Sequence, residues 1–339
     1  MNIKKVLRVA VVAIAILISG VSVAYFAMCQ VGKMELRKPV ELTVDNAMLE
    51  IEDEYHTIFY QGKEYRYKEH MVNVLCLGID KEEHLSVRND VDNSVGQADA
   101  IYLVSMDTKE DKIRILAVPR DTMVILQMYN SLDEYMGMRD GQLTLQYAYA
   151  DGMEKSAQLT VGQVSNILNQ IPVNAYVAIN IYSLWTMNAA IGGVDVVMDA
   201  DYTDLNPAFA SGKTIHLTEK LLENYLRERD VEEAGSAYTR LHRQKQYMLA
   251  FYETAKHKLK TDVTLPLRLL DVLEKDMELD ITIPEMVYLI TEGMQCEFSS
   301  ENIYTLPGAQ VQGEKYEEFH LDKEAVEALV IELFYEEIK

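Results

Sequence analysis

Three apolar runs close together in the chain constrain its fold more than any other feature. Each run is apolar on both faces of an extended strand, and the turn Asp107-Thr108-Lys109 joins the second run to the third. Continuous apolar strands of this kind usually lie in the middle of a sheet that is covered on both faces. We therefore expect an α/β fold with helices on both faces of a central sheet. The three predicted strands are Val72–Asp80, Ala100–Met106 and Lys112–Val118.

The rest of the chain alternates between helical and extended periodicity. Helices are expected at Gln142–Gly152, Thr160–Leu168, Ile181–Ala190, Leu217–Asn224 and Ala237–Lys260. Further strands are expected at Ala175–Asn180, Val194–Met198 and Tyr225–Arg229. We expect residues 71–260 to form the main domain. Residues 261–339 are predicted to be a helical C-terminal part packed on the same domain, apart from an extended Asn302–Leu306.

The N-terminus has the pattern of a membrane anchor. Lys4, Lys5 and Arg8 precede an apolar stretch over residues 9–28. About 20 helical residues at about 1.5 Å each span about 30 Å, the hydrocarbon thickness of a bilayer. A cleaved signal peptide has a shorter apolar core, usually about 7–15 residues. We predict a short cytoplasmic N-terminus over residues 1–8 and a single-pass transmembrane helix over residues 9–28. The C-terminal domain is expected to be extracellular, although basic residues also follow the span and weaken the charge asymmetry that sets orientation.

Residues 29–70 are predicted to form an extracellular stem with a tyrosine-rich hairpin. Aromatic residues flank the segment Gln61-Gly62-Lys63 on both sides, at Phe59 and Tyr60 before it and at Tyr65 and Tyr67 after it. A glycine-bearing turn between such segments is typical of a β-hairpin. We expect this part to act as a spacer that lifts the main domain off the membrane.

The charge balance excludes one class of partner. The chain has 32 Lys+Arg against 54 Asp+Glu, a formal net charge of −22. Nucleic-acid binding depends on neutralising backbone phosphates with positive charge, so no nucleic-acid partner is expected. The cysteines and histidines show no spacing typical of a disulfide framework or a zinc site.

Four arginines nevertheless gather in one short segment of this acidic chain. In a strand over Tyr225–Arg229, Arg227 and Arg229 would share one face. In the next helix along the chain, Arg240, Arg243 and Gln244 are neighbours at i, i+3 and i+4. The cluster could form surface salt bridges with nearby carboxylates. Its place near the start of a helix, on the side that continues as an apolar row, favours a pocket for a phosphate-bearing substrate.

Two aspartates and one arginine are predicted at strand boundaries. Asp80 ends the first strand, Asp99 precedes the second, and Arg120 comes after the third, with Asp121 beside it. Loops at strand ends are where open α/β sheets place ligand sites. Two carboxylates converging there could hold Mg²⁺, or each could cap a turn. Asp121 could hold Arg120 in place or cap the next segment of the chain.

Taken together, these motifs resemble the LytR-CpsA-Psr (LCP) family of membrane-anchored cell-wall enzymes. The resemblance runs from about Val72 to Tyr252. The motifs that carry it are Leu77-Gly78-Ile79-Asp80, Ala98-Asp99, Val118-Pro119-Arg120-Asp121-Thr122, Ala148-Tyr149-Ala150-Asp151-Gly152, Ile171-Pro172-Val173-Asn174-Ala175-Tyr176, Ile191-Gly192-Gly193-Val194-Asp195-Val196, Leu226-Arg227-Glu228-Arg229-Asp230 and Arg240-Leu241-His242-Arg243-Gln244.

The resemblance implies a central mixed β-sheet and a Mg²⁺-dependent phosphotransferase. Members of the family transfer phosphate-linked glycopolymers from undecaprenyl pyrophosphate to peptidoglycan outside the membrane. By carry-over, Asp80 and Asp99 would be the Mg²⁺ ligands. The pyrophosphate site would be lined by Arg120, Arg227, Arg229, Arg240, Arg243 and Gln244. Catalysis would depend on Arg120, Arg227 and Arg229, with Asp121 orienting Arg120.

One departure from the family pattern bears on activity. The second aspartate of the family usually comes after an Arg-x pair, whereas Gln97-Ala98 occupies that place here. One positive charge is therefore missing from the expected pocket. Two alternatives stay open: a polyprenyl-pyrophosphate phosphatase with water as acceptor, and a non-catalytic cell-envelope regulatory protein of the same fold.

Overall fold

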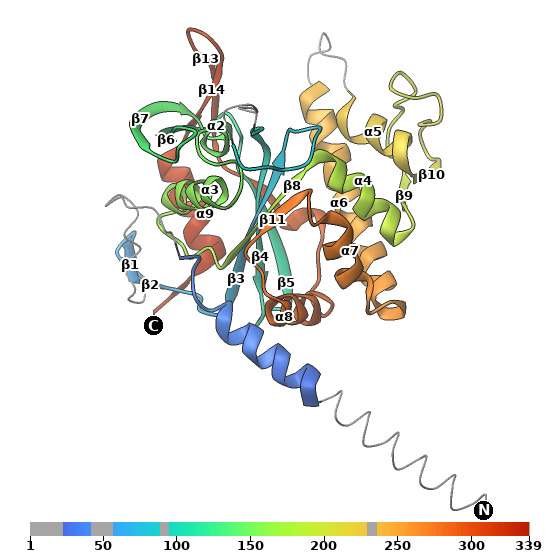
Figure 1. Ribbon diagram of the computed structural model, residues 1–339, viewed down its shortest axis with the longest axis horizontal. Coiled ribbons are helices and arrows are strands. Elements are labelled where there is room, and N and C mark those ends of the chain that lie inside the picture. Colours follow the sequence, from blue (N-terminus) through green and yellow to red (C-terminus); the bar gives the residue numbers. More distant parts are fainter. Residues whose placement is uncertain (1–22, 42–56, 89–94, 229–235, 339) are drawn as a thin grey trace, which may run out of the picture.

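The computed structural model describes residues 23–41, 57–88, 95–228 and 236–338. At its centre is a six-stranded mixed sheet with the strand order β11-β8-β3-β4-β5-β12 (Figure 1). This confirms the predicted α/β class and the three central strands. The sheet strands are β3 (Met71–Ile79), β4 (Ala98–Asp107), β5 (Lys112–Ala117), β8 (Ala175–Asn180), β11 (Met277–Leu279) and β12 (Ile303–Thr305).

Strand directions bring several chain segments to one edge of this sheet. β3 pairs parallel with β8 and antiparallel with β4, β4 pairs antiparallel with β5, and β5 pairs parallel with β12. The carboxyl ends of β3, β5, β8 and β12 therefore lie at the edge where β4 begins. We call this the carboxyl edge. The opposite edge, where β3 begins and β4 ends, is the amino edge.

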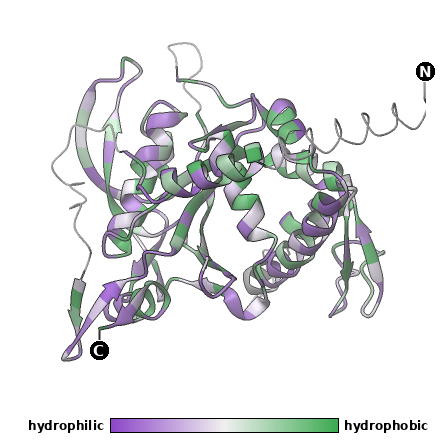
Figure 2. Ribbon diagram, turned by 90° about the horizontal axis from the view of Figure 1, so that it is seen from below, coloured by the Kyte–Doolittle hydropathy of each residue, from purple (hydrophilic) through white to green (hydrophobic). Residues whose placement is uncertain are grey.

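Helices lie on both sides of the central strands, as the view from below shows (Figure 2). One face packs against α3 (Glu154–Ile167) and α9 (Lys323–Phe334) in the largest hydrophobic core. Leu75, Leu77 and Leu103 point into this core and are fully or almost fully buried. Burying such side chains contributes roughly 1.5–3 kcal/mol each, so this face holds the sheet in place.

A second core lies on the other side of the sheet and joins several helices to a small two-stranded sheet. It surrounds the fully buried Phe209 and Tyr225. Its elements are α4 (Ile181–Ile191), α5 (Glu219–Arg227), α6 (Ser236–Thr261), α7 (Leu265–Leu273), β9 (Val194–Val197) and β10 (Thr214–Leu217).

The amino edge is closed by α8 (Ile283–Gly293) and by a helix over residues 23–35 (Figure 1). These two helices approach closely, because a Cβ at Gly32 would lie 2.1 Å from the carbonyl oxygen of Pro284. Tyr25 and Thr291 also share a hydrogen bond of 2.5 Å between their hydroxyls. Leu36, just after the first helix, is fully buried against Tyr288 of α8.

The predicted hairpin at Gln61-Gly62 is confirmed. β1 (Thr57–Tyr60) and β2 (Lys63–Tyr67) pair antiparallel, and the turn residues have φ of 47° and 81°. Both residues are in the left-handed region that a tight type I′ turn requires. β2 also pairs with β15 (Tyr335–Glu337), the last described strand. The hairpin is therefore joined to the folded domain rather than held apart from it.

The structure corrects several expectations. The predicted strand at Tyr225–Arg229 is wrong over its described part, because α5 continues to Arg227. The C-terminal part is less helical than expected, since it supplies β11 and β12 to the central sheet. Two further hairpins, β6–β7 and β13–β14, were not expected from the sequence. The elements not yet given are β6 (Met123–Tyr129), β7 (Tyr135–Gln142), α2 (Thr144–Ala148), η1 (Ser300–Asn302), β13 (Gly308–Gln312) and β14 (Glu317–Leu321).

Most of the predicted transmembrane helix, residues 9–22, lies outside the described residues. Within the part of the chain that is described, no helix combines the length and the apolar character needed to cross a bilayer. The predicted membrane anchor stays a prediction.

Tyr335 offers a test of how β15 holds the N-terminal hairpin. Its ring is buried against Tyr67, at a centroid distance of 5.8 Å, while its hydroxyl is buried without a hydrogen-bond partner among the described residues. Tyr335→Ala should lower the free energy of unfolding by about 3–5 kcal/mol, the usual cost of removing a large buried ring. Tyr335→Phe should leave stability unchanged or raise it, because it removes an unsatisfied hydroxyl.

Urea unfolding of the two variants measures this difference. Glu337→Ala is the matched control in the same strand, since its ion pair with Lys63 is exposed and should contribute less than about 1 kcal/mol. A loss of stability in Tyr335→Phe as large as in Tyr335→Ala would contradict the packing role.

Candidate functional site

The carboxyl edge brings Asp80 and Asp99 to the same end of the paired strands β3 and β4. The backbone N–H of Asp80 donates to the carbonyl of Gln97 at 2.9 Å, two residues before Asp99. Gly96 makes this approach feasible. Its φ is 81°, and a Cβ there would lie 2.7 Å from a methyl carbon of Ile79. A larger residue at position 96 would push the two strand ends apart.

Arg120 lies at the same edge and is paired with Asp99. Its Nη1 is 2.5 Å from Oδ2 of Asp99, and its Nε is 3.7 Å from Oδ1 of Asp121. Asp99 also accepts a hydrogen bond from the hydroxyl of Thr144 at 3.3 Å. The Arg120 side chain is 48% exposed. The guanidinium is therefore held in place yet open to solvent, as a group that binds a ligand must be.

Asp121 is held by Gln142, at the end of β7, and by the β13–β14 hairpin. Its carboxylate accepts from Nε2 of Gln142 at 2.9 Å, and its carbonyl accepts from the backbone N–H of Phe319 at 2.9 Å. Burial raises the pKa of Asp121, Arg120 lowers it, and Glu317 and Asp99 raise it further. Glu317 is a member of this site that the sequence did not indicate, because its hairpin is exposed and shows no hydrophobic alternation.

The first turns of α6 also reach toward the carboxyl edge. Nζ of Lys245 lies 3.5 Å from the carbonyl of Ile303 on β12, and the hydroxyl of Tyr252 donates to the carbonyl of Cys296 at 2.7 Å. α6 therefore runs from the carboxyl edge toward the amino edge. Arg240 precedes Lys245 by more than one helical turn, which places it nearer the carboxyl edge. Burial raises the pKa of Tyr102 on β4, and the positive charge of Arg240 opposes that rise.

Arg243 has a structural position that its spacing in the sequence does not reveal. Its side chain is 1% exposed and donates to the carbonyls of Asn224, Tyr225 and Glu228 at 3.2, 2.7 and 2.5 Å. These carbonyls belong to the C-terminal end of α5, where backbone acceptors lack partners within the helix. The guanidinium also lies 5.5 Å from the ring centroid of Tyr202. The assignment of Arg243 to the pyrophosphate site is therefore corrected: Arg243 caps α5.

Gln244 has a similar capping role at the end of α5. Nε2 of Gln244 donates to the carbonyl of Leu226 at 3.1 Å, so it also serves the end of α5. Arg227 is 46% exposed in the last turn of α5, and its nearest carboxylate is Glu223 at 3.8 Å. Arg229 lies outside the described residues. Among the predicted arginines that are described, Arg120 and Arg227 are about half exposed and Arg240 is half-buried.

The sheet face below this edge is apolar but incompletely covered. On the side of α4 and α6, the side chains of Cys76, Tyr102, Val104, Val177 and Ile179 are half-buried, whereas their neighbours on the opposite face are fully buried. Burial raises the pKa of the Cys76 thiol to about 12. The face is suited to an apolar chain that enters beneath the arginines.

The carboxylates at this edge form a donor set that suits a hard cation. Asp80 and Asp99 provide oxygen ligands of the kind that Mg²⁺ prefers. No group of three or more His, Cys, Asp or Glu side chains in the described ranges is arranged to hold a metal by itself. Two carboxylates fit a Mg²⁺ ion that shares its remaining positions with phosphate oxygens and water.

The comparisons with known proteins agree on one family. The LytR_cpsA_psr family model matches residues 41–334. A curated relative from Bacillus cereus, polyisoprenyl-teichoic acid–peptidoglycan teichoic acid transferase TagU, is 26% identical over 241 residues, 71% of this chain and 70% of the relative. The same-named protein of Halalkalibacterium halodurans is 29% identical over 178 residues, 52% of this chain and 51% of the relative.

Solved structures share the fold at lower identity. TagT bound to LIIa-WTA has a TM-score of 0.57 and 20% identity, and the match covers 78% of this chain and 89% of TagT. The crystal structure of Bacillus subtilis TagU has a TM-score of 0.52 and 20% identity, with 78% of this chain and 95% of TagU covered. These likenesses establish the common mixed α/β architecture.

The contrast between Arg243 and Arg227 can be tested through stability. Arg243→Met should lower the free energy of unfolding by about 2–4 kcal/mol, because buried carbonyls at the end of α5 lose a charged donor. Arg227→Met is the matched control and should change stability by less than about 1 kcal/mol, because its ion pair is exposed. Thermal and urea unfolding measure both. Equal effects of the two substitutions would contradict the capping role.

Proposed function

The chain belongs to the LytR_cpsA_psr family, and on this premise we propose that it transfers a phosphate-linked glycopolymer from an undecaprenyl-pyrophosphate carrier to peptidoglycan. The observation that carries the proposal is the group of charges at the carboxyl edge, where Arg120 is fixed between Asp99 and Asp121. A relative that is named for joining teichoic acid to peptidoglycan supports the reaction class.

The diphosphate would bind where the accessible guanidinium groups meet the sheet. Arg120 offers donors at the carboxyl edge, and Arg240 approaches from α6. An arriving diphosphate competes with Asp99 for Arg120, because phosphate oxygens are strong acceptors for a guanidinium fork. We assign Arg227, which is 46% exposed in the last turn of α5, to the outer part of the site. Arg229 lies outside the described residues, and its role stays a prediction from the sequence.

We propose that Asp80 and Asp99 hold a Mg²⁺ ion. When Arg120 turns from Asp99 to a phosphate, the Asp99 carboxylate becomes available to the cation. Bound Mg²⁺ would supply neutralising charge for the diphosphate oxygens. Gln97 in place of an arginine leaves one positive charge fewer at this edge, which increases the importance of the cation and of Arg120.

The chemistry requires positioning and charge stabilisation more than covalent help from the protein. A sugar hydroxyl of peptidoglycan forms a new oxygen–phosphorus bond to the polymer-bearing phosphorus. The bond from that phosphorus to the bridging oxygen breaks, and the carrier leaves as its monophosphate. Arg120 stabilises the charge that develops on the phosphate oxygens, and Asp121 keeps Arg120 oriented. The Asp121 carboxylate lies 3.7 Å from Arg120, so it is also our candidate to accept the hydroxyl proton.

The lipid part of the donor is assigned to the half-buried apolar sheet face beside α4 and α6. Such a face favours a flexible hydrocarbon, because contact with the lipid removes its apolar side chains from water. We further propose that residues 9–28 anchor the chain in the cell membrane, with the domain on the outside. This arrangement supplies a lipid-linked donor from the same membrane.

Arg120→Ala tests the central role of the guanidinium. Turnover should fall by at least about 100-fold, the usual loss when one donor to a developing oxyanion is removed. The melting temperature should change little, because Arg120 is half exposed. The assay incubates the full chain in detergent with a labelled lipid-linked saccharide and peptidoglycan fragments, and measures the joined product. Arg268→Ala is the matched control, since Arg268 forms an exposed pair with Asp262 away from the edge.

Different products in that assay separate the alternatives. Joined product that is lost in Arg120→Ala supports the transferase. Released phosphate without joined product would indicate hydrolysis with water as acceptor. No turnover by the unmodified chain would favour a non-catalytic role. Collapse of the fold in Arg120→Ala would make this arginine structural.

Asp99→Ala tests the proposed cation site. The Mg²⁺ concentration for half-maximal turnover should rise by about tenfold or more, because one of two carboxylate ligands is lost. Titration of activity with MgCl₂ measures this shift, and Asp262→Ala provides a control at a remote ion pair. An unchanged titration curve would remove Asp99 from the cation site.

A further inference from the structure

The turn between α6 and α7 projects from the end of the domain to which the first helix is attached. The hydroxyl of Tyr252 in α6 donates to the carbonyls of Gly293 and Cys296, both at 2.7 Å, at the C-terminal end of α8. Nζ of Lys256 donates to the same carbonyl of Cys296 at 2.9 Å. From Lys256, α6 continues to Thr261, a further rise of about 7.5 Å. Because α6 runs toward the amino edge, the turn lies beyond the end of α8.

The first helix places the start of the described chain at the same level. The hydroxyl of Tyr25 is bonded to that of Thr291, in the last turn of α8, at 2.5 Å. Figure 1 shows α8 and the first helix at this lower end of the molecule. Tyr25 and Phe26 are 50% and 65% exposed, and they fall within residues 9–28, the proposed membrane anchor. Aromatic side chains at the end of a span are typical of the interface between hydrocarbon and water. The turn after α6 therefore lies at the level of the proposed membrane surface.

Residues 258–267, which we call the α6–α7 corner, expose apolar side chains at this level. Val263 is 80% exposed and Leu267 is 50% exposed. Leu265, between them, is buried in the second core. The corner is therefore fixed to the domain by one apolar side chain while two others point outward. Beside a membrane anchor, such side chains favour shallow insertion at the boundary between head groups and acyl chains.

The charge of the corner is opposite in sign to that of the whole chain. The last turn of α6 carries Lys258 and Lys260. The carboxylate that follows them, Asp262, is paired with Arg268 at 2.9 Å. The full sequence has a formal net charge of −22, so most of its surface would be repelled by an anionic bilayer. Lysine side chains can keep their ammonium groups among lipid phosphates while their stems lie along apolar surface. An anionic phospholipid surface is therefore the partner that fits this corner.

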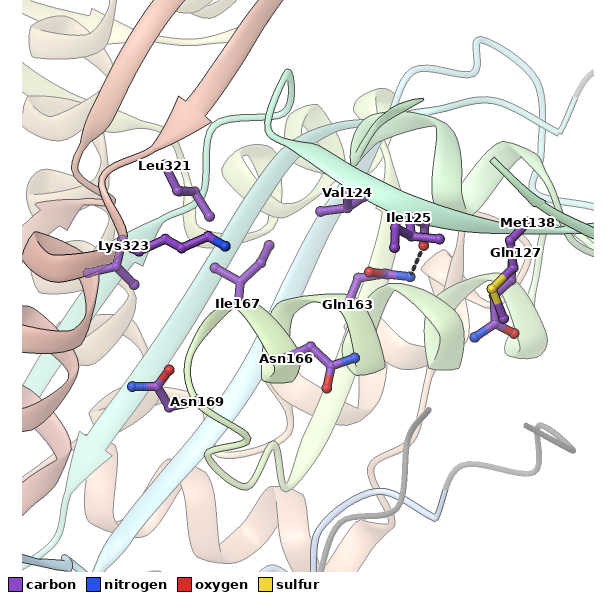
Figure 3. Close-up of a pocket in the computed structure, with 11 residues that line it drawn as sticks. Val124, Ile125, Gln127, Met138, Gln163, Asn166, Ile167, Asn169, Leu321 and Lys323 are labelled. Atoms are coloured by element: carbon purple, nitrogen blue, oxygen red, sulfur yellow. Dashed lines mark hydrogen bonds between the residues drawn. The ribbon is translucent and has the colours of Figure 1, made fainter. Parts of the chain in front are cut away.

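The carboxyl edge of the domain offers the same residue types without this arrangement. Lys323 lines the groove between the β6–β7 hairpin, α3 and α9 (Figure 3). Val311 on β13 is 46% exposed, and Lys315 lies in the turn between β13 and β14. The hairpin is held near the charged centre, because the N–H of Phe319 donates to the carbonyl of Asp121. These residues therefore provide matched controls far from the amino edge.

We propose that the α6–α7 corner docks on the anionic phospholipid surface of the membrane, as a second contact beside the anchor. The inference rests on the proposed anchor but not on the transfer reaction. Val263 and Leu267 enter the head-group region, and the two lysines pair with lipid phosphates. Two separate contacts prevent rotation of the domain about the first helix. Because α6 borders the half-buried sheet face, docking also holds the amino end of that face at the membrane.

The first test measures contact between the corner and lipid. The full chain carrying Val263→Trp is reconstituted in vesicles of phosphatidylcholine and phosphatidylglycerol, with or without brominated acyl chains. The fluorescence of the added tryptophan should fall about twofold or more in brominated vesicles, because the side chain enters the acyl boundary. The unmodified chain, whose one tryptophan is Trp185, provides the background. Val311→Trp is the matched control and should show no added quenching.

The second test measures the role of the lysines. Each lysine near an anionic surface favours the docked state by about fivefold, so Lys258→Gln with Lys260→Gln should lower the ratio of docked to undocked chain by about 25-fold. The quenching of Val263→Trp should then be largely lost, as it should be in vesicles of pure phosphatidylcholine. Lys315→Gln with Lys323→Gln removes the same charge at the other end of the domain and should leave the quenching unchanged.

The outcomes separate docking from the other proposals. Equal quenching of Val263→Trp and Val311→Trp, or quenching that is independent of lipid charge, would overturn the docking. A chain that does not float with the vesicles would refute the anchor and the docking with it. A chain that floats without quenching of Val263→Trp would refute the docking alone. Quenching as expected in a chain that transfers nothing would support the docking and refute the transferase.

Discussion

The position of β3 between β4 and β8 is the constraint on which the rest of the structure depends. β3 is parallel to one neighbour and antiparallel to the other, and its side chains are buried on the α3–α9 face. A shift of one residue would move that apolar set to the other face, so the register is strongly fixed. Because the register is fixed, Asp80, the start of β4 and the end of β5 meet at one edge. The group of charges around Arg120 at the carboxyl edge therefore results from the pairing of the strands.

The charges around Arg120 are compatible with the anion site that we propose for this acidic chain. Most carboxylates are solvated on the surface, where screening limits their reach. At the carboxyl edge, carboxylates instead hold a guanidinium in one orientation before any ligand arrives. Such preorganisation would lower the cost of reorganising the site for the diphosphate that we propose as its ligand. The surplus negative charge is thus compatible with a local anion site, although it excludes a diffuse basic surface.

Much of this arrangement was predictable from the sequence, and the failures have identifiable causes. The central strands were predictable because their apolar runs are continuous, and Asp80, Asp99 and Arg120 were predictable because they flank those runs. Arg243 was assigned to the wrong environment, since spacing along a helix places it beside Arg240 without showing that the end of α5 lies against it. The last turn of α5 looked like a strand because Tyr225, Arg227 and Arg229 alternate with other residues. β11 and β12 have three residues each and are defined by long-range pairing, which no local pattern reveals.

The helix over residues 23–35 enters the domain at the end of the sheet opposite Arg120. β4 has 10 residues and spans the sheet between these ends, a length of about 33 Å at about 3.3 Å per residue. In the proposed arrangement, the length of the sheet would set the distance between the membrane attachment and the charges around Arg120. A lipid bound to the half-buried face as we propose would have to span that whole distance before its head group reached Arg120. Chain length would then act as a measure of donor identity, independent of the sugar that the donor carries.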